Sequence, residues 1–159
     1  MKHVYLIGGP MGIGKSTICN QLNQELDHSV FLDGDWCWNM DPFIVNQDTK
    51  NMVLDNITHC LNNFIHTPGI ENIIFCWVMH KQDIIDQIIQ KLDTEGVDIH
   101  LISLICEKEE LIKRMLIDRR DNQTIRKSLQ YLELYKDLDT QKIDVTTLDV
   151  QKTIDKIKR

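Results

Sequence analysis

The sequence predicts a single α/β domain in which helices cover both faces of a parallel sheet. Short apolar runs alternate with longer amphipathic stretches along all 159 residues, and a glycine-rich segment separates the first run from the first amphipathic stretch. Neighbouring parallel strands need crossover connections, and helices supply them. The length suits one domain with one substantial core, so we expect a single domain spanning residues 1–159.

Five apolar runs predict the strands: Val4–Ile7, Val30–Leu32, Asn72–Met79, Asp98–Ile105 and Lys142–Val145. The third run is the most apolar, which indicates a central place in the sheet. Amphipathic stretches predict the helices: Ser16–Leu26, Asp48–Ile65, Gln82–Leu92, Glu107–Ile117, Thr124–Leu138 and Val150–Ile157. In the first of these, Ile18, Leu22 and Leu26 repeat every four residues, the spacing of one helix face.

The composition narrows the class of protein. A formal net charge of −6 argues against a general affinity for nucleic acid. The chain enters a strand at once, without the pattern of a signal peptide, and its longest apolar runs are too short to span a bilayer. The five cysteines are widely spaced and form no CxxC pair, so they suggest neither a zinc site nor a disulfide framework. We expect reduced thiols in a cytoplasmic protein with no membrane partner.

The glycine-rich segment Gly9-Pro10-Met11-Gly12-Ile13-Gly14-Lys15-Ser16 has the spacing of a phosphate-binding loop, or P-loop. Glycines let the backbone bring N–H groups close to phosphate oxygens, and the following helix points its positive end at them. Lys15 is expected to reach the β- and γ-phosphates, and the Ser16 hydroxyl is a ligand for Mg²⁺. The residues expected to bind a nucleoside triphosphate are Gly9, Met11, Gly12, Ile13, Gly14, Lys15, Ser16 and Thr17. The alternative is a tight strand-to-helix turn without a ligand.

With this loop and Phe31-Leu32-Asp33-Gly34-Asp35 at the end of the second strand, the chain resembles the small P-loop kinases. These include shikimate, gluconate, adenylylsulfate and chloramphenicol kinases and the nucleoside monophosphate kinases, and the resemblance covers nearly the whole chain. It implies a three-layer α/β/α sandwich with strand order 2-3-1-4-5, and ATP and Mg²⁺ as cofactors. It also implies that Asp33 helps to hold the metal and that Asp35 binds and deprotonates the acceptor hydroxyl. The alternative is that Asp33-Gly34-Asp35 is a solvated turn.

Two absences favour this resemblance over other P-loop proteins. The third strand ends without an acidic residue, whereas motor ATPases and switch GTPases usually carry an aspartate there for Mg²⁺. No Asn-Lys-x-Asp motif for guanine appears, although ATP and GTP are not separated firmly by this.

Arginines gather where the resemblance implies a short mobile lid, at residues 114–126. Arg114 matches an arginine that lies against the adenine in shikimate-kinase-like enzymes. Arg119 or Arg120 would fold over the β- and γ-phosphates, and Arg126 would contact phosphate or acceptor. Such cations neutralise the charge of the transferred group. The alternative is a solvated helix end, salt-bridged by Asp118 and Asp121.

Aromatic residues next to Asp35 are expected to form the acceptor pocket. Large apolar side chains in a loop suggest a use, because each buries much area when it packs. The pocket residues expected besides Asp35 are Trp36, Trp38, Asn39, Phe43 and Trp77. The alternative is that they pack the second helix onto the sheet. No basic residue lies between Asp33 and Lys50, which favours a neutral hydroxyl compound over an anionic one.

The turn after the fifth strand resembles the one whose backbone contacts the adenine edge in these enzymes. Thr146 is the nucleotide-binding candidate there, and a purely structural role for it is equally open. Another open point is His80, which follows the third strand and either touches the acceptor or is a capping or solvent-exposed residue.

The function expected is ATP- and Mg²⁺-dependent phosphorylation of a hydroxyl group on a small molecule: a metabolite, an antibiotic or a nucleoside. A nucleoside monophosphate is the alternative acceptor. A non-catalytic nucleotide-binding regulatory module is the alternative of another class, and an RNA-repair component is disfavoured by the acidic charge. The oligomeric state is not indicated.

Overall fold

The computed structural model describes residues 1–159 and has the predicted architecture. The strands are β1 (Lys2–Gly8), β2 (Ser29–Asp33), β3 (Asn72–Trp77), β4 (Val97–Ile105) and β5 (Gln141–Asp144). The helices are α1 (Lys15–Glu25), α2 (Gln47–His66), α3 (Gln82–Lys91), α4 (Lys108–Ile117), α5 (Asn122–Tyr135) and α6 (Val150–Ile157), with a short 3₁₀ helix, η1 (Gly34–Trp38). The five strands form one sheet in the predicted order β2-β3-β1-β4-β5.

All four neighbouring pairs of strands are parallel. The middle position belongs to β1, and β3, the most apolar run, is an interior strand beside it. Both strands therefore deliver their carboxyl ends to the centre of one sheet edge. Ligands of open α/β sheets bind outside this edge.

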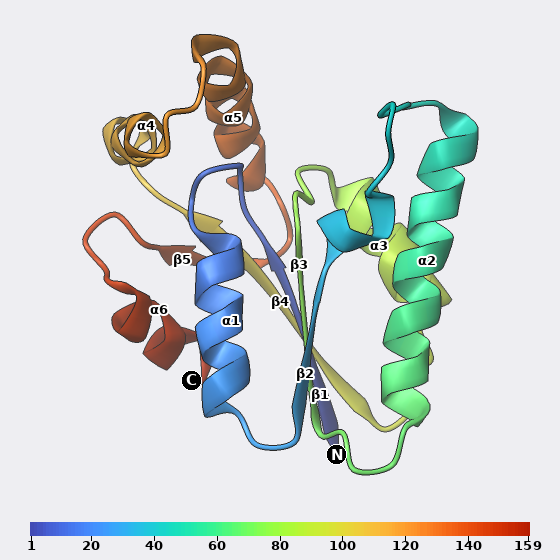
Figure 1. Ribbon diagram of the computed structural model, residues 1–159. Helices are drawn as coiled ribbons and strands as arrows, with labels where there is room; N and C mark the ends of the chain where they lie inside the picture. Colours follow the sequence, from blue (N-terminus) through green and yellow to red (C-terminus); the bar gives the residue numbers. More distant parts are fainter.

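Helices cover both faces of the sheet, as Figure 1 shows: α1 and α6 lie on one side, and α2 and α3 on the other. Successive side chains of a strand point to opposite faces. In β1, Tyr5 and Ile7 pack in the core under α1 and α6, whereas Val4 and Leu6 pack in the core under α2 and α3. The continuous apolar run is thus explained by burial on both faces.

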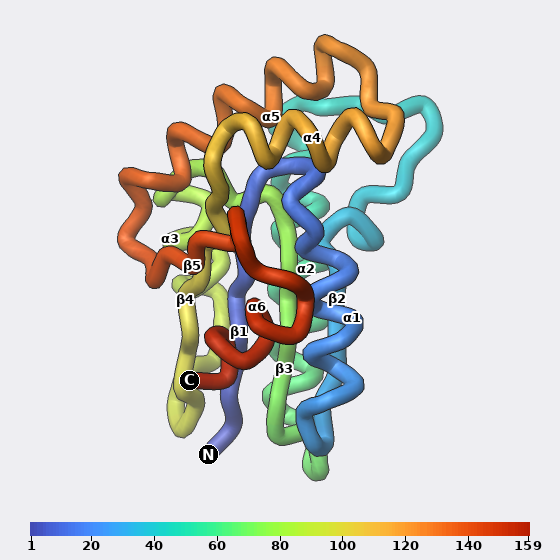
Figure 2. Tube along the Cα trace, turned by 90° about the vertical axis from the view of Figure 1, so that its left-hand side faces the viewer, coloured from blue at the N-terminus to red at the C-terminus, as the bar shows by residue number.

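Helices α4 and α5 lie near the end of the sheet where β1 turns into α1, which Figures 1 and 2 show from two sides. Met115 of α4 and Leu132 of α5 are both buried in the core that also contains Ile7 and Ile13. This packing places both helices against the glycine-rich loop. No helix of the chain combines the length and the apolar character that a membrane crossing requires.

The segment after β2 is more regular than the loop expected from the sequence. Residues Gly34–Trp38 form η1, and Asp33 caps it by accepting a hydrogen bond from the Asp35 N–H (3.0 Å). Gly34 is needed because a Cβ there would lie 2.4 Å from Cγ of Trp77. The indole therefore packs directly on the backbone of η1 and fixes this helix against the end of β3.

Candidate active site

The glycine-rich loop joins β1 to α1 and depends on glycine at two positions. Gly12 and Gly14 have φ values of 85° and 103°, in the left-handed region that other residues avoid. Space is short as well, since a Cβ on Gly12 would lie 2.4 Å from Cγ of Met115. Gly14 is the N-cap of α1, so the loop runs directly into the first helical turn.

The loop and the start of α1 contain N–H groups that have no backbone acceptor. The N–H groups of Gly12 and Gly14 donate to no backbone oxygen of the chain. The first N–H groups of α1, from Lys15 on, have no acceptor within the helix, as at any helix start. Such a set of donors at the positive end of a helix dipole is a binding site for phosphate.

Helix α5 holds the carbonyl groups of the same loop. The Tyr135 hydroxyl donates to the Gly9 carbonyl (2.9 Å), and the Ser128 hydroxyl donates to the Met11 carbonyl (2.6 Å). Both side chains are fully buried. With its carbonyls held on the α5 side, the loop keeps its N–H groups free for a ligand.

Arg114 of α4 makes a third connection to the loop. Its guanidinium donates to the carbonyl of Ile13 (3.0 Å) and to the carbonyl of Val145 (2.9 Å), and it forms an ion pair with Glu110 (3.1 Å). The side chain therefore links the loop to the turn after β5. It also lines the cavity described below, where the resemblance places the nucleotide base.

Lys15 lies folded back on the loop. Its ammonium group donates to the carbonyls of Gly9 (2.7 Å) and Pro10 (3.0 Å). Burial lowers the pKa of Lys15, and the nearby Asp35 and Asp33 oppose this shift. A partly desolvated cation at the loop attracts a phosphate more strongly than a solvated one would.

The structure brings Ser16, Asp33 and Asp35 together at the ends of β1 and β2. The Ser16 hydroxyl donates to one carboxylate oxygen of the buried Asp33 (2.8 Å), and the Asp35 N–H donates to the other (3.0 Å). Hydroxyl and carboxylate oxygens are the ligands that Mg²⁺ prefers. These oxygens therefore suit the metal-binding role expected for Ser16 and Asp33.

Asp35 has the environment of a general base. Burial raises the pKa of Asp35, and the neighbouring charge of Asp33 raises it further. Lys15 and the neighbouring Trp77 favour the carboxylate and oppose that rise. A carboxyl group whose pKa is shifted toward neutral is better matched to proton abstraction near neutral pH.

The aromatic residues divide into two groups. Trp77 contacts Asp35, whereas Trp36, Trp38 and Asn39 line a cavity of about 1010 Å³ between η1 and α2. Asp35, Trp77 and Phe43 are outside the lining of this cavity. The alternative that all of them pack the second helix onto the sheet does not describe Trp36. This side chain is 59% exposed, and its ring is tilted by 60° against that of Phe31 (ring centroids 5.2 Å apart).

The arginines of the expected lid are placed on both sides of a short turn. The segment 114–126 comprises the last turn of α4, the residues 118–121 and the start of α5. Arg119, Arg120 and Arg126 are exposed and form no ion pair. Asp121 instead caps α5 by accepting from the Thr124 N–H (2.7 Å), so the salt-bridged helix end is not formed.

A second cavity, of about 450 Å³, lies beside the loop on the side of α6. Its lining is shared by the loop, α1, α4 and the turn after β5: Gly12, Ile13, Gly14, Thr17, Ile18, Arg114, Ile117, Asp118, Leu148, Asp149, Val150 and Thr153. Thr146 is not part of this lining. Its hydroxyl donates to Asp144 (2.6 Å) and accepts from the Glu107 N–H (2.8 Å), which is a structural role.

Several site residues were missed by sequence reasoning. Ser128 and Tyr135 lie on the apolar face of α5 with Ile125 and Leu132, and a serine on such a face is a signal of a buried hydrogen bond. Leu148 and Val150 carry no comparable signal. His80 is neither a helix cap nor fully exposed. Its ring stacks on that of Tyr131 (centroids 4.0 Å apart), and its Nδ1 atom has no hydrogen-bond partner. Burial lowers the pKa of His80, and the positive charges of Lys81 and Lys127 lower it further.

Fold and loop together define a P-loop NTPase-like α/β domain, the class that the sequence predicts. Residues 6–137 match a protein-family model described as an AAA domain, and the chain belongs to this family. No curated protein matches the sequence.

Solved structures share this fold over nearly the whole chain. A gluconokinase from Sinorhizobium meliloti 1021 has a TM-score of 0.73 at 15% identity, covering 96% of this chain and 87% of that one. A tunicamycin resistance protein from Deinococcus radiodurans has a TM-score of 0.69 at 15% identity, covering 99% and 93%. A shikimate kinase from Acinetobacter baumannii has a TM-score of 0.65 at 19% identity, covering 99% and 90%. These likenesses confirm the predicted group of folds, that of the small P-loop kinases.

Proposed function

We propose that the protein transfers the terminal phosphoryl group of ATP to a hydroxyl group of a small molecule. One observation carries the proposal: the hydrogen-bonded chain Ser16–Asp33–Asp35 joins the phosphate-binding loop to a carboxylate suited to act as a base. A nucleotide-binding module without transferase activity needs the loop but has no use for Asp35 beside it.

The residues of the loop fit a nucleoside triphosphate with Mg²⁺. The free N–H groups of Gly12 and Gly14 and the ammonium of Lys15 would hold the phosphates, and Ser16 with Asp33 would hold the metal. When bound, ATP supplies the group to be transferred and Mg²⁺ neutralises part of its charge. The cavity beside Arg114 has room for the base of the nucleotide.

Asp35 binds the acceptor hydroxyl and takes its proton as the new O–P bond forms. Lys15 and Trp77 both oppose the rise in the pKa of Asp35 and so favour the ionised carboxylate. The exposed, unpaired guanidinium groups of Arg119, Arg120 and Arg126 are the cations available to neutralise the developing charge.

The acceptor expected is neutral. The nearest segments, η1 and the mostly exposed residues 39–46, contain no lysine or arginine that would hold an acceptor phosphate. Trp36 and Phe43 are exposed there and offer faces for a ring. A nucleoside monophosphate remains the alternative acceptor only if the arginines of α4 and α5 reach it.

The test is ADP formation with Mg²⁺ across a panel of nucleosides, nucleoside monophosphates, sugars and hydroxyl-bearing antibiotics. An acceptor of the right class should raise ADP release well above background. Asp35→Asn should lower that rate by at least about a hundredfold while ATP affinity stays within about threefold of wild type. Lys15→Ala should lose ATP affinity itself.

Asp137→Asn is the matched control, because it removes an exposed carboxylate just after the C-terminal end of α5. Its activity should equal that of the wild type. If Asp35→Asn retains full acceptor-stimulated turnover, the assignment of the base is wrong. If ATP binds and no acceptor in the panel stimulates turnover, the regulatory module is favoured.

A further inference from the structure

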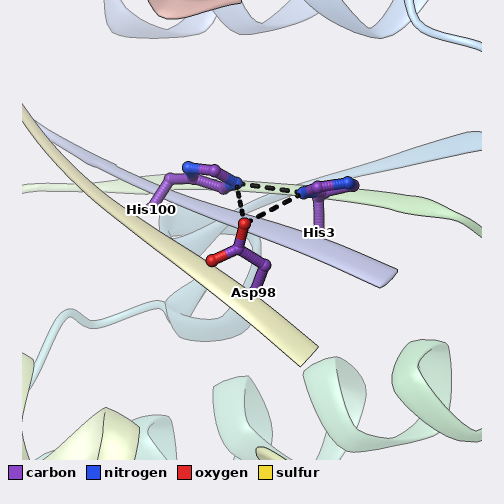
Figure 3. A group of neighbouring side chains, drawn as sticks. All are labelled: His3, Asp98 and His100. Atoms are coloured by element: carbon purple, nitrogen blue, oxygen red, sulfur yellow. Dashed lines mark hydrogen bonds and ion pairs between the residues drawn. The ribbon is translucent and has the colours of Figure 1, made fainter. Parts of the chain in front are cut away.

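A second group of polar side chains lies at the opposite end of the sheet from the loop. In the register of β1 and β4, His3 is paired with Asp98, and His100 follows two residues further along β4. Side chains two residues apart in a strand share one face, so all three project from the α1 and α6 face of the sheet. Figure 3 shows them converging on one point from the two strands.

The three nearest ligand atoms form a small triangle. The Nδ1 atom of His3 lies 3.1 Å from Nε2 of His100, and one carboxylate oxygen of Asp98 lies 3.6 Å and 3.5 Å from these two nitrogens. The two nitrogen–oxygen distances are longer than normal hydrogen bonds. Ligands at about 2.0–2.2 Å from a tetrahedral zinc ion are separated by about 3.3–3.6 Å, which two of the three sides match and the third approaches.

We propose that His3, Asp98 and His100 bind a divalent transition-metal ion of the zinc class. Two imidazoles and one carboxylate are a ligand set typical of Zn²⁺, with the fourth position left to water. The side chains are 39%, 50% and 34% exposed, so the ion has a path from solvent and the fourth position is open. The Tyr5 ring stacks on His100 (4.6 Å, 13°) and holds its orientation.

This ion is separate from the Mg²⁺ expected at the loop. His3 and Gly8 are five residues apart on β1, roughly 16 Å along a strand. Imidazole nitrogen also suits zinc, copper and nickel, whereas Mg²⁺ prefers oxygen ligands. Binding at His3, Asp98 and His100 joins the two central strands β1 and β4, so the expected consequence is a more stable sheet.

The experiment is a titration of chelator-treated protein with Zn²⁺ and, separately, with Co²⁺, whose visible absorption reports tetrahedral coordination. We expect one ion per chain and a melting temperature that rises with metal concentration. His3→Ala and His100→Ala should abolish both effects. Asp98→Asn keeps the shape of an exposed side chain, and should weaken binding at least about tenfold.

His66→Ala is the matched control, since it removes a histidine that is paired with a single carboxylate, Asp93 (2.6 Å). It should bind metal like the wild type. The proposal is overturned if the wild-type protein binds no ion stoichiometrically. It is equally overturned if the ion still binds to Asp98→Asn and His100→Ala with unchanged affinity, because the ligands would then be elsewhere, for example the half-buried thiols of Cys37 and Cys60.

Discussion

Replacing Ser128 with alanine tests how the phosphate-binding loop is held. The Ser128 hydroxyl is the one side-chain donor to the Met11 carbonyl, at 2.6 Å, and the residue is completely buried. The Gly9 carbonyl, in contrast, accepts from both Tyr135 and Lys15. Ser128→Ala should therefore disturb the loop more than Tyr135→Phe, which leaves its carbonyl with a second donor.

The magnitude follows from what the Met11 carbonyl loses. A hydrogen bond contributes about 1 kcal/mol net when both partners are exchanged for water, whereas removing only the donor from a buried acceptor costs about 1–3 kcal/mol. Met11 is only half-buried, so water can replace the hydroxyl and the loss belongs to the lower part of this range. If this energy of about 1–2 kcal/mol is needed to hold the loop in its binding conformation, the variant loses about the same amount of binding free energy. Its nucleotide affinity then falls about five- to thirtyfold.

Chemical denaturation and calorimetric titration with ADP measure stability and affinity separately. Ser103→Ala is the control, because Ser103 is equally buried and its hydroxyl forms a hydrogen bond with Thr140 (2.7 Å) and with no atom of the loop. The control should lose stability and keep its affinity. If Ser128→Ala loses stability yet binds ADP like the wild type, the α5 contact does not preorganise the loop and the reasoning fails.

Three further changes test separate parts of the site. Gly12→Ala should lower the free energy of unfolding by roughly 2–4 kcal/mol, because the new Cβ would clash with Met115. Gly69→Ala is the control, since Gly69 has a similar φ of 90° but open space around it, and it should lower the free energy by about 1 kcal/mol. Equal losses for the two variants in chemical denaturation would contradict the clash with Met115. In the pH profile of acceptor-stimulated ADP formation, the midpoint of the acid limb should lie above the ordinary aspartate pKa of about 3.9. The reason is that the pKa of Asp35 is raised, so its active carboxylate forms only at higher pH. Trp77→Phe should move that limb to higher pH, because Trp77 lowers the pKa of Asp35, and a shift to lower pH would contradict this effect of Trp77. Arg114→Lys should lower the free energy of unfolding by about 1–3 kcal/mol, because lysine cannot donate to the carbonyls of Ile13 and Val145 at the same time, as the guanidinium does. An unchanged free energy of unfolding in chemical denaturation would show that these two hydrogen bonds contribute nothing.

The strands and the loop were predictable because their signals are local. A short, continuous apolar run such as Ile73–Cys76 is typical of a strand that is buried on both faces of a sheet. The loop needs left-handed backbone at Gly12 and Gly14, and glycine is visible in the sequence. Strand order came from the resemblance, because periodicity says which face is buried and not which strand is the neighbour.

The parts that were not predictable depend on distant partners. Ser128 and Tyr135 contact residues 117 and 126 positions away, and a pattern on α5 shows only that they face inward. Gly34 looks like an ordinary turn residue, yet its role is to leave room for the Trp77 ring. The role of Thr146 was not predictable either, because its hydroxyl accepts from the N–H of Glu107, which is 39 residues away in the sequence.

The spacing of the two hydroxyls on α5 has a consequence for motion. Ser128 and Tyr135 are seven residues apart, about two helical turns, so they lie on one face and reach the loop at Met11 and Gly9 together. A rotation of α5 about its axis would break both of these hydrogen bonds in the same movement. The position of the loop is thus coupled to the orientation of α5. We therefore expect a nucleotide that binds the loop to slow hydrogen exchange along α5 as well as in the loop itself.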